Sequence, residues 1–476
     1  MDRSNRGVVW MYNWDKLSCD TLAVAKDASA YGSNMFAKNS DRPIGECQPL
    51  IWIPGAHHEK GERLDGTGTI IPQAEYTYGV LGSKPYWIWG FEMGLNEKGV
   101  IIGNEAENSK DRNLEKHDGL LGMDLLRLGL ERGATAKEAL QVIVSLLEEY
   151  GQNHNANALF DARYENSYII MDEKEIWILE TAGRRWVAKL VKTGMFNIGN
   201  CYSVETVFDL ASPDLESHAR KNRWLFPDET FNFAKAYMAN IPAQTLAIPR
   251  WRRVNQLAHQ YEKHTFESLK RIFRDHYEDD PILKPRYGAA SGYFPTVCRH
   301  ALTWEASQTG ASMLAYYRDG LCPVVRNAFC QPCCSIYLPV YPGIKLPELM
   351  TKGEGKFDSE SLWWLTDRLD KLIGMDEARF SPVAHQKLYA LENKINKKAE
   401  DAEKKAIKLI AGGKKKEAQE LLSDLMVNSA MEAKKLLVSL IEDFQAAISE
   451  LGVDKIQGTR IDFLKKYCDI TEMNLV

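Results

Sequence analysis

The chain of 476 residues has no long apolar run. None of its hydrophobic stretches approaches the ~18 residues of a transmembrane helix, so we expect no membrane span. A basic excess is also absent, because 60 Lys and Arg residues are outnumbered by 65 Asp and Glu residues, which gives a formal net charge of −5. We therefore expect no nucleic acid and no anionic membrane surface among its partners.

The N-terminal segment would also make a poor secretory signal peptide. The N-terminal segment has no continuous apolar core, because Asn13, Asp15 and Lys16 interrupt it. The nine cysteines are odd in number and irregularly spaced, unlike the paired cysteines of small secreted domains. Both features favour reduced thiols and a cytoplasmic location.

The composition is that of a globular protein, with 45% hydrophobic and 26% charged residues. Its length can hold two or three domains. After about Tyr341 the character changes, and residues 385–450 are rich in Ala, Glu, Lys and Leu, with a break at Gly412 and Gly413. This pattern predicts a helical hairpin or a small bundle. The predicted organisation is a leader at 1–18, a core at 19–345 and a C-terminal helical extension at 346–476.

Strands and helices alternate in blocks along the predicted core. Predicted strands lie at 20–25, 35–38, 100–102, 167–171, 175–180 and 185–190. Residues 119–150 predict two amphipathic helices separated at Gly133, and a capping box of Thr135 and Glu138 starts the second. This order of strands, helices and strands predicts stacked sheets covered by helices, an α+β fold.

One stretch, Ser18 to Pro43, combines strand signals with reactive groups. Cys19 stands at the head of an apolar run, and a second run leads into K-N-S-D at 38–41. Two strands joined by a turn would place Lys38 and Asp41 back beside Cys19. We hypothesise that Cys19 becomes the first residue of the mature chain and acts as a nucleophile. The alternative is a small buried residue in a strand, a common setting for cysteine.

A thiol at a chain N-terminus carries its own general base. The free α-amine has a pKa of about 7.7–8.0 and the thiol a pKa of about 8.5, so the amine can take the thiol proton near neutral pH. In this scheme Lys38 favours the thiolate and Asp41 orients the α-ammonium. The reaction also needs oxyanion donors, and side-chain amides serve well. Asn104, at the end of a predicted buried strand, is our candidate.

Several segments together carry a family likeness. They are Cys19, K-N-S-D-R-P (38–43), W-G-F-E-M-G-L-N-E-K-G-V (89–100), G-N-E-A (103–106), G-L-L-G-M-D-L-L-R-L-G-L-E-R-G (119–133), A-K-E-A-L-Q-V-I-V-S-L-L-E-E-Y-G-Q (136–152) and I-W-I-L-E-T-A-G (176–183). The sequence resembles the secernins, a branch of the C69 dipeptidase family among the N-terminal-nucleophile hydrolases. The likeness is dense over about 19–200 and thinner to about 345.

The resemblance implies a four-layer αββα sandwich, in which two antiparallel sheets lie between helical layers, with a C-terminal helical region in addition. It implies hydrolysis of a small amide (C–N) bond, and dipeptidase activity is the family's usual label. The implied mechanism needs no metal and no cofactor.

Site residues follow from a more distant similarity to the bile-salt hydrolase and penicillin V acylase group. In that group an Arg-Asn-x-Asp strand end follows the nucleophile, and Lys38 and Asp41 match its charged positions. Asn104 matches an oxyanion Asn of the group, and Asn200 is the candidate for a further Asn that would hold the oxyanion together with Asn104. A later active-site Arg has no secure match, and Arg299 and Arg318 stay open as alternatives.

The nucleophile hypothesis requires a cleavage. Eighteen residues precede Cys19, whereas many relatives have only a few, and the Cys19 nitrogen is an amide until residues 1–18 are removed. We therefore predict a cut between Ser18 and Cys19. An N-to-S acyl shift at the same thiol is one route, and the sequence leaves open whether the cut is self-catalysed.

A second cysteine pattern, C-Q-P-C-C at 330–334, contains a single C-x-x-C pair. Cys322, Cys298 and His300 are nearby in the sequence, so a zinc site is the alternative to buried strand thiols. Zinc sites usually show two clear half-sites, and only one is present here. The sequence therefore favours buried thiols and predicts no metal.

The predicted substrate is a small peptide or an N-acyl amino acid, and a homo-oligomer stays open. Two other functions also stay open. One is a non-catalytic interaction protein that keeps the fold, in line with the link between the secernin name and regulated secretion. The other is an acyltransferase that uses the same site with an amine acceptor in place of water.

Overall fold

The computed structural model describes residues 18–66, 68–111, 119–158, 161–280, 296–301, 307–451 and 459–475. The chain divides into two compact units, of which the first comprises Met1–Lys38 and Trp52–Thr265 and the second Asn39–Ile51 and Phe266–Val476. Except for Ser18, the predicted leader lies outside the described residues. The predicted boundary between 345 and 346 lies inside the second unit.

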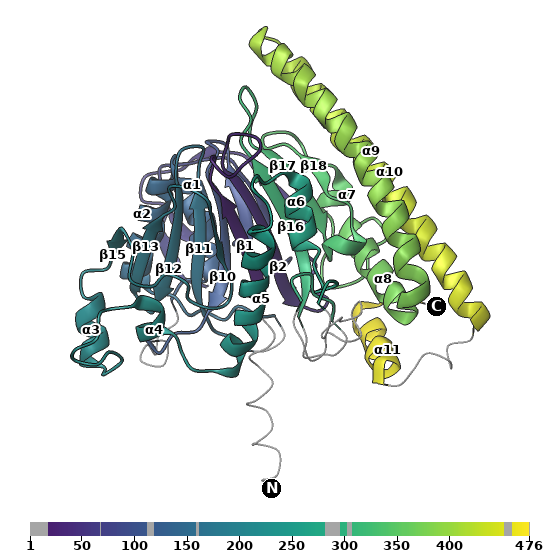
Figure 1. Cartoon of the computed structure of the whole chain (residues 1–476). Helices are drawn as coiled ribbons and strands as arrows, with labels where there is room; N and C mark the ends of the chain where they lie inside the picture. Colours follow the sequence, from purple (N-terminus) through teal and green to yellow (C-terminus); the bar gives the residue numbers. More distant parts are fainter. Residues whose placement is uncertain are drawn as a thin grey trace. The chain divides into compact units, whose positions relative to one another are not determined.

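The first unit is built on a sheet with the strand order β15-β13-β12-β11-β10-β9-β8-β3 (Figure 1). Its strands are β3 (Leu50–Ile53), of which only Trp52 and Ile53 belong to this unit, β8 (Val80–Ser83), β9 (Met93–Asn96), β10 (Ile101–Glu107), β11 (Glu165–Met171), β12 (Ile176–Ala182), β13 (Arg185–Leu190) and β15 (Leu210–Ala211). Neighbouring strands from β15 to β8 are antiparallel. β10, β11 and β12 are buried along their whole length, because both faces of the sheet are covered.

Two helices, α1 (Gly122–Arg132) and α2 (Ala136–Tyr150), cover one face of this sheet and pack on β9 to β12. The predicted cap of α2 is confirmed, since the backbone N–H of Glu138 donates to the Thr135 hydroxyl at 3.2 Å. Of the residues predicted to point inward, Tyr150 is only half-buried, and the others are buried: Ala139, Leu140, Ile143, Leu146 and Leu147. The period of 3.6 residues therefore identified the face of α2 that meets the sheet.

The opposite face of the sheet meets β1 (Ser18–Val24), which contacts β10 and β11. β1 lies between β14 (Met195–Ile198) and β2 (Met35–Pro43), and it pairs antiparallel with β14. α5 (Pro242–Ala258) packs on β1 and β14, on the face of these strands that is turned away from β10. The first unit thus contains a helical layer, a sheet, a second sheet and a second helical layer, and the predicted strands at 20–25 and 35–38 are confirmed as β1 and β2.

Short elements complete the first unit. They are β4 (Ala56–His57) paired with β7 (Tyr76–Thr77), β5 (Arg63–Asp65) paired with β6 (Ile70–Pro72), α3 (Leu215–Lys221) and α4 (Phe233–Tyr237).

In the second unit, the C-terminal part of β2 begins a strand order β2-β16-β17-β18. The further elements are α6 (Phe266–Phe273), β16 (Ser307–Tyr316), β17 (Val324–Phe329), the 3₁₀ helix η2 (Pro332–Cys334), β18 (Leu338–Val340), α7 (Glu348–Thr351), α8 (Leu362–Met375), α9 (Glu377–Ala411), α10 (Lys415–Leu451) and α11 (Thr459–Thr471). α9 packs along α10, and the chain turns between them at Gly412 and Gly413. The predicted helical hairpin is therefore confirmed.

All nine cysteines lie in described residues and are free thiols, as their odd number and irregular spacing predicted. Across the helices of the described residues, none is both long and apolar enough to serve as a membrane span. The architecture is that of an α+β protein with C-terminal helices.

Candidate active site

Cys19 and Lys38 face each other in the first unit, on the adjacent strands β1 and β2. Cys19 is buried, and the Lys38 side chain is fully buried and hydrogen-bonded to the Cys19 thiol. Lys38 Nζ also donates to the backbone carbonyl of Asn104 at 2.5 Å and lies 3.7 Å from Glu105 Oε1. The hairpin therefore brings a lysine to the cysteine, as the sequence predicted.

The surroundings of Lys38 hold it in the charged form. Burial disfavours the ammonium, but the negative charges of its neighbours outweigh burial and raise the pKa of Lys38 well above its usual range. These neighbours are, in order of effect, Cys19, Glu105 and Glu92. A buried, permanent cation next to a thiol stabilises the thiolate, the form of cysteine that attacks carbonyl carbons.

Glu105 is the counterpart of Lys38 on β10. Burial raises the pKa of its carboxyl to about 8, although Lys38 and a hydrogen bond from Thr21 act in the opposite direction. Among the described residues, none is a hydrogen-bond partner of its Oε2 atom. Glu105 therefore titrates at about pH 8, on the sheet that faces the strand of Cys19.

Asn200 and Arg250 fix the backbone of Cys19. The Cys19 N–H donates to Asn200 Oδ1 at 2.9 Å, and Arg250 Nη2 donates to the same oxygen at 2.7 Å and to the Cys19 carbonyl at 3.2 Å. Arg250 Nε donates to Asp20 Oδ2 at 3.0 Å. Asn200 Nδ2 donates to the Ala106 carbonyl at 2.9 Å, which ties the group to β10. The nitrogen that cleavage would turn into an α-amine is thus already held by an amide oxygen.

The Asn104 side chain points to the other face of β10. Side chains alternate along a strand, and Glu105, the next residue, is the one that reaches Lys38. The Asn104 amide instead lies 3.0 Å from Asn166 Oδ1 and within hydrogen-bond distance of Glu92. Only the backbone carbonyl of Asn104 meets Lys38. The predicted role of its side chain as an oxyanion donor stays a prediction.

Gly103 allows this close contact. A Cβ atom at this position would lie 2.8 Å from Lys38 Cδ and 2.7 Å from the Phe36 ring, closer than such contacts normally come. Only glycine therefore lets the Lys38 side chain cross β10. In the segment G-N-E-A, it is the glycine and the glutamate that meet Lys38.

Asp41 and the two alternative arginines belong to the second unit. Asp41 Oδ1 accepts a hydrogen bond from Thr309 Oγ1 at 2.7 Å, and its predicted role toward the α-amine stays a prediction. Arg318 pairs with Glu403 at 2.6 Å, and the backbone N–H of Arg299 donates to Thr309 Oγ1. Neither arginine takes the position that Arg250 occupies beside Cys19 in the first unit.

Sequence reasoning missed Arg250, Asp20 and Glu105. Arg250 lies in P-R-W-R-R, where three arginines compete. Arg250 and Arg253 are both buried, and only the fold shows that Arg250 reaches Cys19. Asp20 directly follows Cys19 in a fully buried strand, an unusual place for an acid. The same signal, an acid within the buried run I-I-G-N-E-A-E, could have identified Glu105.

Comparison with known proteins gives a family. The model of Peptidase family C69 matches residues 18–387, most of the chain. A dipeptidase of Bifidobacterium longum (strain NCC 2705) is 29% identical over 208 residues, which are 37% of this chain and 35% of that protein. A probable dipeptidase of Salmonella dublin is 23% identical over 379 residues, 69% of this chain and 82% of that protein. The match thus spans about a third of the first relative's length and most of the second's.

Solved structures with some similarity include a mutant conjugated bile acid hydrolase from Clostridium perfringens, with 13% identity and a TM-score of 0.36 over 65% of this chain and 89% of that chain. A Caenorhabditis elegans ortholog of N-acylethanolamine-hydrolyzing acid amidase has 10% identity and a TM-score of 0.31 over 62% of this chain and 91% of that chain. The family match begins at residue 18, next to Cys19, and includes every predicted site residue. On this match, the chain belongs to peptidase family C69.

Proposed function

We propose that the protein is a cysteine-nucleophile hydrolase of small amide bonds, with dipeptides or N-acyl amino acids as substrates. Cys19 is the nucleophile after removal of residues 1–18. The observation that carries the proposal is the setting of Cys19. Its thiol is hydrogen-bonded to the buried Lys38 ammonium, and its backbone N–H donates a hydrogen bond to Asn200. Both groups of an N-terminal nucleophile, the thiol and the future amine, thus have a dedicated partner.

The reaction would proceed in two halves. The α-amine of Cys19 takes the proton from Sγ, and the thiolate forms a bond to the substrate carbonyl carbon. The resulting α-ammonium then gives its proton to the leaving amine as the C–N bond breaks, which leaves a thioester on Cys19. In the second half the α-amine takes a proton from water, the hydroxide attacks the thioester, and the acid product leaves as the thiol is restored.

Four residues have proposed roles around this chemistry. Lys38 stabilises the thiolate, and Asn200, held by Arg250, positions the amine. Asp41 orients the α-ammonium. Asn104 is retained as an oxyanion donor, a role that requires its amide to turn from Asn166 toward the reacting carbon. The finer fold assignment, a four-layer N-terminal-nucleophile sandwich, and a place in the secernin branch are part of the same proposal. The layer order of the first unit supports the fold assignment.

Maturation would use the same thiol. Cys19 Sγ attacks the carbonyl carbon of Ser18, the Ser18–Cys19 amide bond breaks, and its nitrogen gains a proton to become the α-amine. Water then hydrolyses the thioester and releases residues 1–18.

The test joins the intact mass of the purified protein to an assay. We expect a mass lower by residues 1–18, turnover of part of a dipeptide panel, and loss of turnover in Cys19→Ala. Cys322→Ala, which removes the exposed thiol, is the matched control and should keep wild-type activity.

Unchanged turnover in Cys19→Ala would exclude Cys19 as the nucleophile. An uncleaved chain without turnover would favour the non-catalytic alternative. Transfer of the acyl group to an added amine, with little free acid, would favour the acyltransferase.

A further inference from the structure

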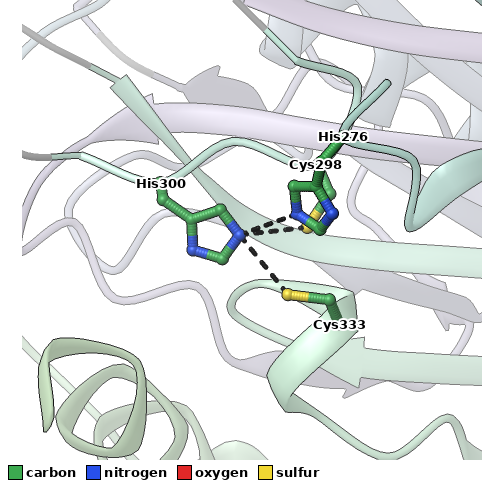
Figure 2. A group of neighbouring side chains, drawn as sticks. All are labelled: His276, Cys298, His300 and Cys333. Atoms are coloured by element: carbon green, nitrogen blue, oxygen red, sulfur yellow. Dashed lines mark hydrogen bonds between the residues drawn. The ribbon is translucent and has the colours of Figure 1, made fainter. Parts of the chain in front are cut away.

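Four buried side chains of the second unit gather around one point (Figure 2). They are His276, Cys298, His300 and Cys333, and their ligand atoms all lie within 4.8 Å of one another. His276 follows α6, Cys298 and His300 precede β16, and Cys333 lies in η2. Three separate segments of the chain therefore deliver two thiols and two imidazoles to the same place.

The distances within the group match the edges of a zinc tetrahedron. His276 Nε2 lies 3.0 Å from His300 Nε2, while Cys298 Sγ and Cys333 Sγ lie 3.6 Å and 3.3 Å from His300 Nε2. With Zn–N bonds of about 2.0–2.1 Å and Zn–S bonds of about 2.3 Å, tetrahedral geometry gives N–N edges of about 3.3 Å and N–S edges of about 3.6 Å. The group is therefore already close to the size of the coordination shell.

Both imidazoles are oriented for a metal by carboxylates. His300 Nδ1 lies 2.6 Å from Asp370 Oδ1, and His276 Nδ1 lies 2.9 Å from Glu278 Oε1. A carboxylate at Nδ1 holds the proton on that nitrogen and leaves Nε2 as the metal ligand, the usual arrangement around zinc-bound histidine. It also leaves two Nε2 lone pairs facing each other in a buried site, an arrangement that a cation between them stabilises.

The C-x-x-C pair that the sequence suggested is not the half-site. Cys330 points elsewhere, to Gln308 Nε2 and Asp367 Oδ1, each at 3.7 Å. Only its partner Cys333 joins the group, while His276 and Cys298 come from outside the C-Q-P-C-C motif. The sequence offered Cys298 and His300 beside the C-x-x-C pair as an alternative, but the lone His276 fits no common zinc motif, so the sequence could not identify the complete set.

We propose that His276, Cys298, His300 and Cys333 bind one zinc ion in a structural Cys₂His₂ site. Four protein ligands close the tetrahedron, so no position is left for water or substrate. All four residues are buried, which also fits a structural ion. The ion would join the segment after α6 to the segment before β16 and to η2, so its role is to stabilise the second unit. It lies outside the proposed chemistry of Cys19.

The test measures metal in the full-length chain. After expression in zinc-supplemented medium and desalting, elemental analysis should give about one zinc per chain. Cys298→Ser and His276→Ala should each lower this ratio at least fivefold. Cys330→Ser is the matched control, since it removes the other thiol of the C-x-x-C pair, and it should keep about one zinc per chain.

A second measurement works on the unchanged chain and keeps the proposal testable when a ligand variant fails to fold. Cobalt(II) exchanged into the protein should show the visible bands of a tetrahedral site and a thiolate charge-transfer band, and X-ray absorption at the zinc edge should fit two sulfur and two nitrogen ligands. Folded wild-type protein without zinc and without these cobalt bands would overturn the proposal. A Cys330→Ser variant that loses zinc as fully as Cys298→Ser would overturn the ligand assignment.

Discussion

The backbone nitrogen of Cys19 donates a hydrogen bond to the side-chain oxygen of Asn200 at 2.9 Å, across 181 positions of sequence. After removal of residues 1–18 this nitrogen would be the α-amine, and Asn200 Oδ1 would hold one of its protons. The lone pair that takes the thiol proton would then be directed by a buried amide. We therefore expect Asn200 to act as a positioning residue for the base.

Replacement of Asn200 tests this role. In Asn200→Ala the amine loses its acceptor and Arg250 loses one of its partners, so we expect kcat to fall on the order of a hundredfold with a smaller change in KM. Steady-state kinetics on the best dipeptide substrate would measure kcat and KM separately. Intact mass would show whether residues 1–18 are still removed.

Asn197→Ala is the matched control. Asn197 lies in β14, three residues before Asn200, and its side chain donates to the Trp251 carbonyl and accepts from Asn255. We expect it to keep the wild-type kcat. An equal loss of kcat in both variants would mean that Asn200 acts only through the packing of β14.

Lys38 sets the charge at the thiol. In Lys38→Met the buried cation is removed, the thiolate is disfavoured, and the acidic limb of the kcat/KM profile should move to higher pH. Near neutral pH we expect at least a tenfold loss of kcat/KM, recovered in part at alkaline pH. Lys38→Arg keeps the charge and should stay closer to wild type than Lys38→Met at every pH. If kcat/KM of Lys38→Met is lower at every pH but its pH profile is not shifted, Lys38 contributes through packing alone.

Local features of the fold could be predicted from the sequence. The hairpin of β1 and β2, the cap at Thr135 and the turn at Gly412 each depend on residues close in sequence, so their signals are complete within a short window. The Cys19–Lys38 contact follows from such a hairpin. These are the parts of the site that composition and spacing could predict.

Long-range contacts could not be predicted in the same way. Arg250 reaches Cys19 from a helix 231 positions away, and the pattern of α5 does not show which of its arginines contacts Cys19. The direction of the Asn104 side chain depends on which face of β10 meets β1, and a strand buried on both faces shows no alternation to decide it. The proposed zinc ligands could not be predicted from the sequence for the same reason, because His276 and Cys333 meet only through the packing of η2.

Arg250 and Asp20 form a buried ion pair whose loss should be costly. Both side chains are nearly inaccessible to water. Arg250→Ala leaves the Asp20 carboxylate without its guanidinium, and we expect a loss of about 3–5 kcal/mol in the free energy of unfolding. Urea unfolding followed by circular dichroism would measure it.

The double variant Asp20→Asn/Arg250→Met separates charge from packing. It removes both charges and keeps similar volumes, so it should recover part of the stability lost in Arg250→Ala. Activity should not return, because Met cannot donate to Asn200. A double variant less stable than Arg250→Ala would contradict the idea that the unpaired charge causes the loss.

Glu105 predicts a pH dependence of stability. Its carboxyl has a pKa of about 8 in the folded chain against an ordinary value of 4.5, so the folded state holds a proton that the unfolded state has released. The contribution of Glu105 is therefore fully present below about pH 4.5 and is lost as the pH rises through about 8. We expect this loss to be on the order of 1–3 kcal/mol between about pH 5 and 8.

The comparison of Glu105→Gln with wild type isolates this effect. Urea unfolding at several pH values should show that the variant gains stability relative to wild type as the pH rises. Glu173→Gln, the same change at an exposed position, should follow the wild-type curve. Parallel curves for Glu105→Gln and wild type would show that Glu105 titrates normally in the folded chain.

Glu403 anchors α9 within the second unit. Its carboxylate accepts hydrogen bonds from Arg326 at 2.8 Å, Arg318 at 2.6 Å and the Tyr341 hydroxyl at 2.7 Å. Arg326 is buried, so Glu403→Ala would leave its charge without a counterion, at a cost of about 3–5 kcal/mol in the free energy of unfolding. Glu403→Gln keeps the acceptor oxygen and should lose less.

Glu400→Ala is the matched control for Glu403→Ala, because it makes the same change on the exposed face of the same helix. It alters helix propensity equally, and its free energy of unfolding should lie within about 0.5 kcal/mol of the wild-type value. Since Trp363 and Trp364 are buried in α8 of this unit, tryptophan fluorescence during urea unfolding can follow the loss. Equal stability of the Glu403→Ala and Glu400→Ala variants would mean that the hairpin is held by its apolar face, and that Arg326 finds another partner.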